Sequence, residues 1–191
     1  MTSRLVVNSV RHTGASADAL TLSSDGKVVF PNNTGNILQV KQAVKTDTAS
    51  SSSATYADIS GLSLSITPAS TSNKILVECR VCSSGKGDSF QAFRVLRDST
   101  ELGLGTGGTG NQLNVSFGTQ GANATTHQYG VRYGVFSFLD SPSSTSALTY
   151  KIQWASVYQS YTSYINRPYS VDNSIYNFFP SSSITVSEVA A

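Results

Sequence analysis

The feature that most constrains the fold is a pair of alternating apolar runs between Ile59 and Cys82. The first run alternates apolar residues with serine and threonine: Leu62, Leu64 and Ile66. In the second run, every other residue from Ile75 to Val81 is apolar, with Glu78 and Arg80 among the residues between. Such alternation predicts strands with one buried face. Pro68 ends the first strand because proline cannot donate to a sheet ladder, so we expect a β-hairpin.

Cys79 and Cys82 are the only cysteines in the chain. Three positions apart on a strand, their side chains point to opposite faces, which argues against a disulfide between them. A Cys-x-x-Cys metal site needs a second pair of ligands, and the sequence has none. We expect Cys79 to be a small buried apolar residue and Cys82 an incidental thiol.

Similar strand-like runs recur between polar, glycine- and proline-containing loops across the rest of the chain. The first run of the main domain alternates Leu38, Val40, Gln42 and Val44. No convincing helical periodicity is present. The predicted fold is therefore all-β, an antiparallel β-sandwich with jelly-roll-like topology over residues 37–191.

Residues 1–36 have a different pattern from the main domain and predict a short N-terminal β-hairpin arm. Two apolar runs flank Asp25-Gly26, a pair favoured in two-residue hairpin turns. A single hairpin is marginal alone in water, so the arm needs a partner. Its apolar side chains are the candidate anchor residues: Leu20, Leu22, Val28 and Phe30.

The run from Phe90 to Leu96 is apolar on both of its faces. A strand of this kind is covered on both sides or is bulged. Coverage by a neighbouring subunit is one explanation. The candidate subunit-interface residues on this basis are Phe93, Val95, Phe136 and Phe138.

Composition and motifs exclude several classes of function. The net charge is only +2, and no cluster of Lys and Arg could follow a phosphate backbone, so we expect no nucleic acid partner. No apolar run is long enough for membrane insertion, and the start lacks the apolar core of a signal peptide. The glycine-rich run Gly103–Gly110 contains G-x-G-x-x-G without a following helix, so we expect no nucleotide cofactor. No catalytic motif or metal-ligand spacing is present, and we expect no enzyme, although a carboxylate pair built in three dimensions stays open.

The aromatic-rich segment near the C-terminus is the best candidate for recognition. Tyrosine rings can stack on sugars while their hydroxyls form hydrogen bonds. The candidate receptor or interface residues are Tyr158, Tyr161, Tyr164, Tyr169, Tyr176, Phe178 and Phe179. The alternative is that these side chains line a subunit interface or cap the core.

Several segments together resemble fibre and adhesion proteins of tailed bacteriophages, particularly those of marine phages. The segments are residues 8–28, Gly35–Val40, Ile59–Val81, Phe138–Pro142, Tyr150–Gln153, Tyr164–Arg167 and Ser183–Ala190. The resemblance implies a virion component assembled in the host cytoplasm as a homotrimer. It also implies that the arm contacts other virion proteins and that the sandwich meets a host-surface glycan or protein receptor.

One departure from long tail fibres is that a single shaft-like unit precedes the sandwich. A capsid-decoration protein that stabilises the particle is therefore the alternative. A polysaccharide-degrading enzyme is a third and weaker interpretation.

Overall fold

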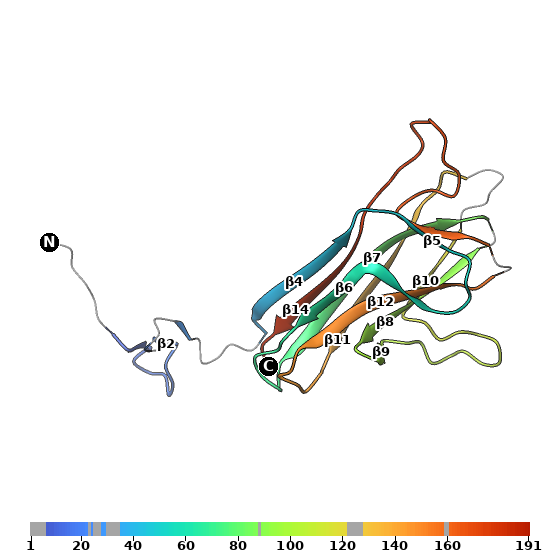
Figure 1. Cartoon of the computed structure of the whole chain (residues 1–191). Helices are drawn as coiled ribbons and strands as arrows, with labels where there is room; N and C mark the ends of the chain where they lie inside the picture. The colour runs from blue at the N-terminus through green and yellow to red at the C-terminus, as the bar shows by residue number, and fades with distance from the viewer. Residues whose placement is uncertain are drawn as a thin grey trace.

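The computed structural model describes residues 7–22, 24, 28–29, 35–87, 89–121, 128–158 and 161–191. Over these residues the chain is all-β, and its sheets are antiparallel. Two large sheets pack face to face as a β-sandwich, and a small third sheet lies near the N-terminus (Figure 1).

The first large sheet, called sheet I, contains four main strands in the order β4 (Ile37–Lys45), β14 (Ser182–Val189), β7 (Lys74–Gly85) and β11 (Arg132–Asp140). Two short strands extend the far end of β7, namely β13 (Ser163–Ile165) and β5 (Ala49–Ser51). The second, called sheet II, has the order β10 (Phe117–Gln120), β8 (Phe90–Arg97), β12 (Leu148–Ser156) and β6 (Ala57–Ile66). The short strand β9 (Thr100–Leu102) also pairs with β8.

The order of the eight main strands is that of a jelly roll. When the eight main strands are numbered along the chain, sheet I contains strands 1, 8, 3 and 6 in that order. Sheet II contains strands 5, 4, 7 and 2. The predicted fold class is therefore confirmed. Most consecutive main strands lie in opposite sheets, so the chain crosses repeatedly from one layer to the other.

The predicted hairpin between β6 and β7 is wrong. Strand β6 pairs with β12 in sheet II, whereas β7 pairs with β11 and β14 in sheet I. The alternation correctly identified the buried faces: Leu62, Ile66, Ile75, Val77, Cys79 and Val81 are buried. The two apolar faces meet across the core instead of lying side by side, and a period-2 pattern describes both arrangements equally well.

A bulge in β6 aligns its inward face with that of the opposing sheet. The register between β6 and β12 shifts between Lys151 and Gln153, opposite the segment that contains Gly61. Gly61 has a φ of 86°, a conformation that glycine adopts without steric cost. The bulge lets Ile59 and Leu62, three positions apart, both point into the core.

Four phenylalanines form a row that closes one side of the sandwich. Phe93 and Phe117 of sheet II stack with ring centroids 4.7 Å apart, and the row continues to Phe136 and Phe138 of β11. Glycines make room for these rings: a Cβ on Gly134 would lie 2.6 Å from the Phe117 ring. Side chains from both sheets thus share one aromatic contact surface.

The chain itself buries part of the predicted subunit interface. Phe93 and Val95 are fully buried inside the sandwich, and Phe136 and Phe138 are half-buried against the same core. On the opposite face of β8, Ala92 and Leu96 are also buried, whereas Phe90 is 41% exposed. Phe93 and Val95 therefore need no second subunit to cover them, and a role of Phe136 and Phe138 at an interface stays a prediction.

The N-terminal arm forms a three-stranded antiparallel sheet from β1 (Ser9–Val10), β2 (Leu20–Leu22) and β3 (Val28–Val29). The predicted pairing of β2 with β3 is present, and β1 is an addition that the sequence did not indicate. Of the candidate anchor residues, Leu22 and Val28 are exposed and Leu20 is half-buried. Phe30 lies outside the described residues, and the division of the chain at residue 36 stays a prediction.

Two buried carboxylates connect segments that are distant in the sequence. Asp140 of sheet I accepts hydrogen bonds from Arg97 Nη1 at 2.6 Å and from the Tyr150 hydroxyl at 2.7 Å, both from sheet II. Glu188 is fully buried and accepts hydrogen bonds from Gln39 Nε2, the Ala69 backbone N–H and Asn73 Nδ2 at 2.6–2.7 Å. The Glu188 carboxylate thus secures the loop between β6 and β7 to the end of β14.

The environment of Glu188 predicts an acid-sensitive fold. Burial alone would raise the pKa of Glu188, but the hydrogen bonds from Gln39, Asn73 and the backbone outweigh it, and the pKa is lowered from 4.5. A carboxyl with a lowered folded-state pKa stabilises the fold above its unfolded pKa, and this contribution is lost as the pH falls through the folded pKa. We expect stability to decline below about pH 4.5.

Replacing Glu188 with Gln tests this assignment. Glu188→Gln places an amide N–H against a hydrogen-bond donor. We expect it to lower the free energy of unfolding by about 2 kcal/mol at pH 7, and we expect the stability of the variant to fall less steeply toward acid pH. Urea unfolding from pH 7 to pH 3 measures both effects. The control is Glu78→Gln, at an exposed glutamate that forms no ion pair within the described residues. If the free energies of unfolding of wild type and Glu188→Gln changed with pH in the same way, the assignment of acid sensitivity to Glu188 would be contradicted.

Candidate recognition site

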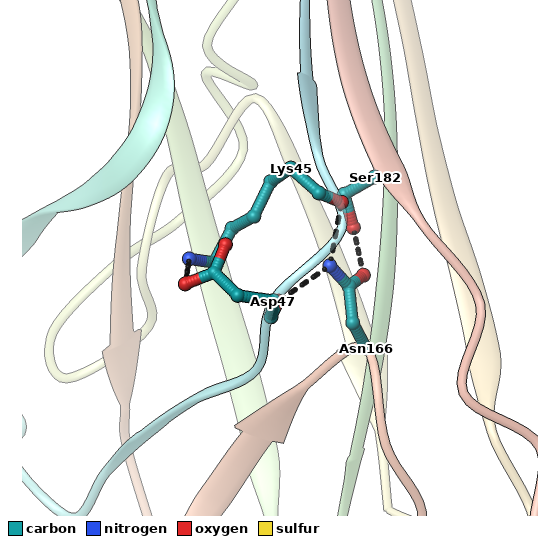
Figure 2. Close-up of polar contacts among 4 residues, drawn as sticks. All are labelled: Lys45, Asp47, Asn166 and Ser182. Carbon is teal, nitrogen blue, oxygen red and sulfur yellow. Dashed lines mark hydrogen bonds and ion pairs between the residues drawn. The ribbon is translucent and has the colours of Figure 1, made fainter.

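The loop of residues 167–181, called the tip loop, joins β13 to β14 and extends beyond the end of the sandwich (Figure 1). Its two ends are fixed by Asn166, which follows β13, and Ser182, which begins β14. The Ser182 hydroxyl donates to Asn166 Oδ1 at 2.6 Å, and Asn166 Nδ2 donates to the backbone oxygens of Lys45 and Asp47 (Figure 2). One buried asparagine therefore joins the base of the tip loop to the end of β4.

The backbone at Asn166 explains why asparagine occupies this position. Its φ is 59°, in the left-handed region that asparagine tolerates better than most residues. The Asn166 N–H donates to the Cys82 carbonyl at 3.1 Å, and the Ser182 hydroxyl accepts from the Cys82 N–H at 2.9 Å. The chain thus turns sharply out of β13 while its polar groups stay paired.

An ion pair lies beside this contact. Lys45 is 3% exposed, and its Nζ lies 2.8 Å from Oδ2 of the exposed Asp47 (Figure 2). The hydrogen bond from the Lys45 ammonium holds the pKa of Asp47 below its ordinary value. The buried ammonium therefore has a charged partner at the protein surface.

Asp172 organises the tip loop from within. Its carboxylate accepts hydrogen bonds from the Ser174 N–H, from Asn177 Nδ2 at 2.7 Å and from the Tyr129 hydroxyl at 2.6 Å. The Tyr129 hydroxyl, together with Asn177, lowers the pKa of Asp172 below its ordinary value. The Ser174 hydroxyl in turn accepts from the Tyr176 N–H. The polar side chains of the loop are thus used to shape its own backbone.

Four large apolar or aromatic side chains of the tip loop are strongly exposed. Ile175 is 85% exposed, and Tyr176, Phe178 and Phe179 are between 56% and 61% exposed. The sequence analysis selected the three aromatic residues but missed Ile175, because a single isoleucine outside a strand pattern carries no signal. An exposed apolar cluster of this kind marks an interaction site.

The other aromatic candidates lie in separate pairs. Tyr158 and Tyr161 form an edge contact, and Lys86 lies 5.0 Å from the Tyr161 ring centre. Tyr164 and Tyr169 form a second pair, with Arg167 4.4 Å from the Tyr164 ring centre. Tyr161, Tyr164 and Tyr169 are only half-exposed. The structure therefore divides the predicted set, and only Tyr176, Phe178 and Phe179 share the tip.

A second exposed surface covers the outer face of sheet I. Two apolar rows lie on strands at opposite sides of this face: Leu38, Val40 and Val44 on β4, and Tyr133, Val135 and Leu139 on β11. Between them lie Glu78, Arg80 and Thr185 in a shallow hollow of about 430 Å³. The apolar residues of β4 therefore face outward, which the sequence could not distinguish from facing the core.

The described residues contain no group of three or more His, Cys, Asp or Glu side chains that could hold a metal ion. Both cysteines are buried and free, and burial raises the pKa of Cys79 to about 12 and of Cys82 to about 11. Cys79 belongs to the main core cluster, whereas Cys82 is buried outside it. In the same part of the chain, no helix is long and apolar enough to cross a membrane.

Comparisons with known proteins give few matches. No family model and no curated protein matches the chain. One similar solved chain belongs to the structure of infectious bursal disease virus Gx strain, with 11% sequence identity and a TM-score of 0.38. The match covers 96% of this chain and 42% of that chain, so this chain spans less than half of its length. We transfer no function at this level of similarity, and the resemblance to bacteriophage fibres stays a prediction.

Substitution of Asn166 tests the attachment of the tip loop. We expect Asn166→Ala to lower the free energy of unfolding by about 3 kcal/mol, because it removes three side-chain hydrogen bonds, two of them buried, and disfavours the positive φ. Asn166→Gly, which keeps the backbone conformation accessible, should cost about 1 kcal/mol less. Urea unfolding measures both variants, and limited proteolysis should show faster cleavage within residues 167–181. Equal stability of wild type and Asn166→Ala would contradict this role.

Proposed function

We propose that this chain is a virion structural protein of the fibre or adhesion type, which displays the jelly roll outward and attaches the particle to a host surface. The observation that carries the proposal is the apolar tip loop. Its exposed residues are held on a stable sandwich by the Asn166 contacts and the Asp172 turn. A rigid aromatic surface binds a partner at low entropic cost.

The arm supports the other half of the proposal, which is anchoring to the particle. Its small sheet exposes Val10, Leu22 and Val28 at 39% to 51% of their surface. A three-stranded sheet with exposed apolar side chains gains stability when a second surface covers them. We infer that residues 1–36 pack against other virion proteins.

The outer face of sheet I supports assembly into a homotrimer. The β4 row and the β11 row lie on opposite sides of this face, so one copy can contact two neighbours at once. Around a three-fold axis, the β4 row of each copy would meet the β11 row of the next, and the charged strip with Glu78 and Arg80 would face the axis. Contacts between unlike surfaces of this kind form closed rings.

Sedimentation analysis tests the trimer. We expect the wild-type chain to sediment as a trimer and Val135→Lys to weaken association about a hundredfold, because a charge would enter the β11 row. Val40→Lys should act in the same way from the opposite row. Ile175→Lys, in the tip loop, is the control and should leave association unchanged. A monomeric wild-type chain at micromolar concentration would rule out the trimer.

Adsorption of particles tests the attachment role. Particles that carry Phe178→Ser with Phe179→Ser should assemble normally and adsorb to host cells about tenfold more slowly, because about 2 kcal/mol or more of apolar contact is removed. Leu113→Ser, in a different loop, is the matched control, since Leu113 is also about half exposed. Unchanged adsorption would overturn the attachment role and favour capsid decoration, which imaging of the chain on intact particles would then locate.

A further inference from the structure

We propose that the tip loop inserts into the interfacial region of a lipid bilayer. This inference rests on the proposed attachment function and names the surface that the loop contacts. Ile175, Tyr176, Phe178 and Phe179 lie within five residues of one another and are the most exposed large hydrophobic side chains of the loop. Apolar side chains gathered at one protruding end gain free energy from entering the acyl boundary.

The side chains of Asp172 and Asn177 are committed to the structure of the loop. Both oxygens of Asp172 and the amide N–H groups of Asn177 form hydrogen bonds inside the loop or with Tyr129. A sugar site needs side chains that donate and accept hydrogen bonds in defined directions, together with an aromatic face. Because these carboxylate and amide groups are used internally, the exposed surface of the loop offers mainly apolar contact, with Asn173 as an exposed amide beside it.

Tyrosine side chains accompany the apolar residues of the tip loop. The Tyr129 ring lies 6.3 Å from that of Tyr176, and Tyr164 and Tyr169 form a pair where the loop leaves β13. Tyrosines are enriched at the level of lipid headgroups, where one end of the ring is apolar and the other is hydrated. Exposed apolar side chains with tyrosines beside them therefore match the composition of an interfacial segment.

Cationic side chains complete this arrangement. Arg167 lies over the Tyr164 ring at the base of the loop, and Arg132 is exposed on β11 beside Tyr133, whose hydroxyl donates to the Ser181 carbonyl. The acid of the loop, Asp172, is exposed, and its carboxylate accepts hydrogen bonds from Tyr129 and Asn177. Arginines near a lipid surface favour anionic lipids, so Arg167 and Arg132 favour a lipid surface over an uncharged apolar pocket in a protein.

The proposed insertion is shallow. The sequence analysis predicted no membrane insertion from the length of the apolar runs, a criterion that applies to spanning segments and not to a loop that enters the interface. One tip with four apolar residues binds weakly and reversibly, and several tips on one particle would strengthen binding without new contacts. Several weak tip contacts of this kind would hold a particle at a membrane surface although each single contact is short-lived.

Vesicle co-sedimentation of the full chain tests the proposal. We expect binding to vesicles of equimolar phosphatidylcholine and phosphatidylglycerol, and weaker binding to phosphatidylcholine alone. Phe178→Ser with Phe179→Ser should reduce the partition coefficient about a hundredfold, because two aromatic side chains no longer enter the interface. Leu113→Ser is the control and should bind like wild type. Absence of wild-type binding to both vesicles would overturn the proposal.

A fluorescent reporter at the tip provides an independent measurement. The chain has one tryptophan, the buried Trp154. In a Trp154→Phe background, Phe178→Trp should show a blue shift with the anionic vesicles and quenching by brominated lipids, and Leu113→Trp in the same background should show neither. An unchanged Phe178→Trp spectrum would contradict insertion.

Failure of this inference is distinguishable from failure of the attachment role. If particles with Phe178→Ser and Phe179→Ser adsorb to cells more slowly while the wild-type chain does not bind vesicles, the partner is a protein or glycan and the lipid proposal is wrong. If vesicle binding is present but adsorption is unchanged, the lipid contact stands and the attachment role is wrong.

Discussion

The rest of the structure depends on the burial of one face of each large sheet against the other. Antiparallel sheets can leave one face in water, but the opposite face must find apolar cover. Here the cover for sheet I is sheet II, and the strands alternate between them so that successive segments supply opposite walls of the same core. The loops that cross from one layer to the other gather at the ends of the sandwich, where they are free to carry function.

The alternation in β6 and β7 predicted two strands and their buried faces correctly, because side-chain direction in a strand is a local property. It did not predict their partners. Pairing in a jelly roll joins residues that are far apart in the sequence, and no local pattern records it. The same limit applies to β8, whose two apolar faces suggested a second subunit although Phe93 and Leu96 are both buried by the chain itself.

The candidate recognition site was predictable in part. The aromatic-rich segment near the C-terminus was the candidate for recognition, and Tyr176, Phe178 and Phe179 are exposed. The contacts that hold them were not predictable. Asn166 bonds to the backbone of Lys45, 121 residues earlier, and nothing in the neighbouring sequence signals such a partner. Strongly exposed and half-exposed aromatic residues also look alike in sequence, which is why Tyr164 and Tyr169 were grouped with the tip.

The Asn166 contact has a consequence for how such a protein can change. Because Asn166, Ser182 and the end of β4 fix the loop at its base, substitution of the exposed residues Ile175, Phe178 and Phe179 leaves these contacts in place. Exchange of these side chains could therefore alter the exposed surface of the loop without removing the hydrogen bonds that attach it to the sandwich.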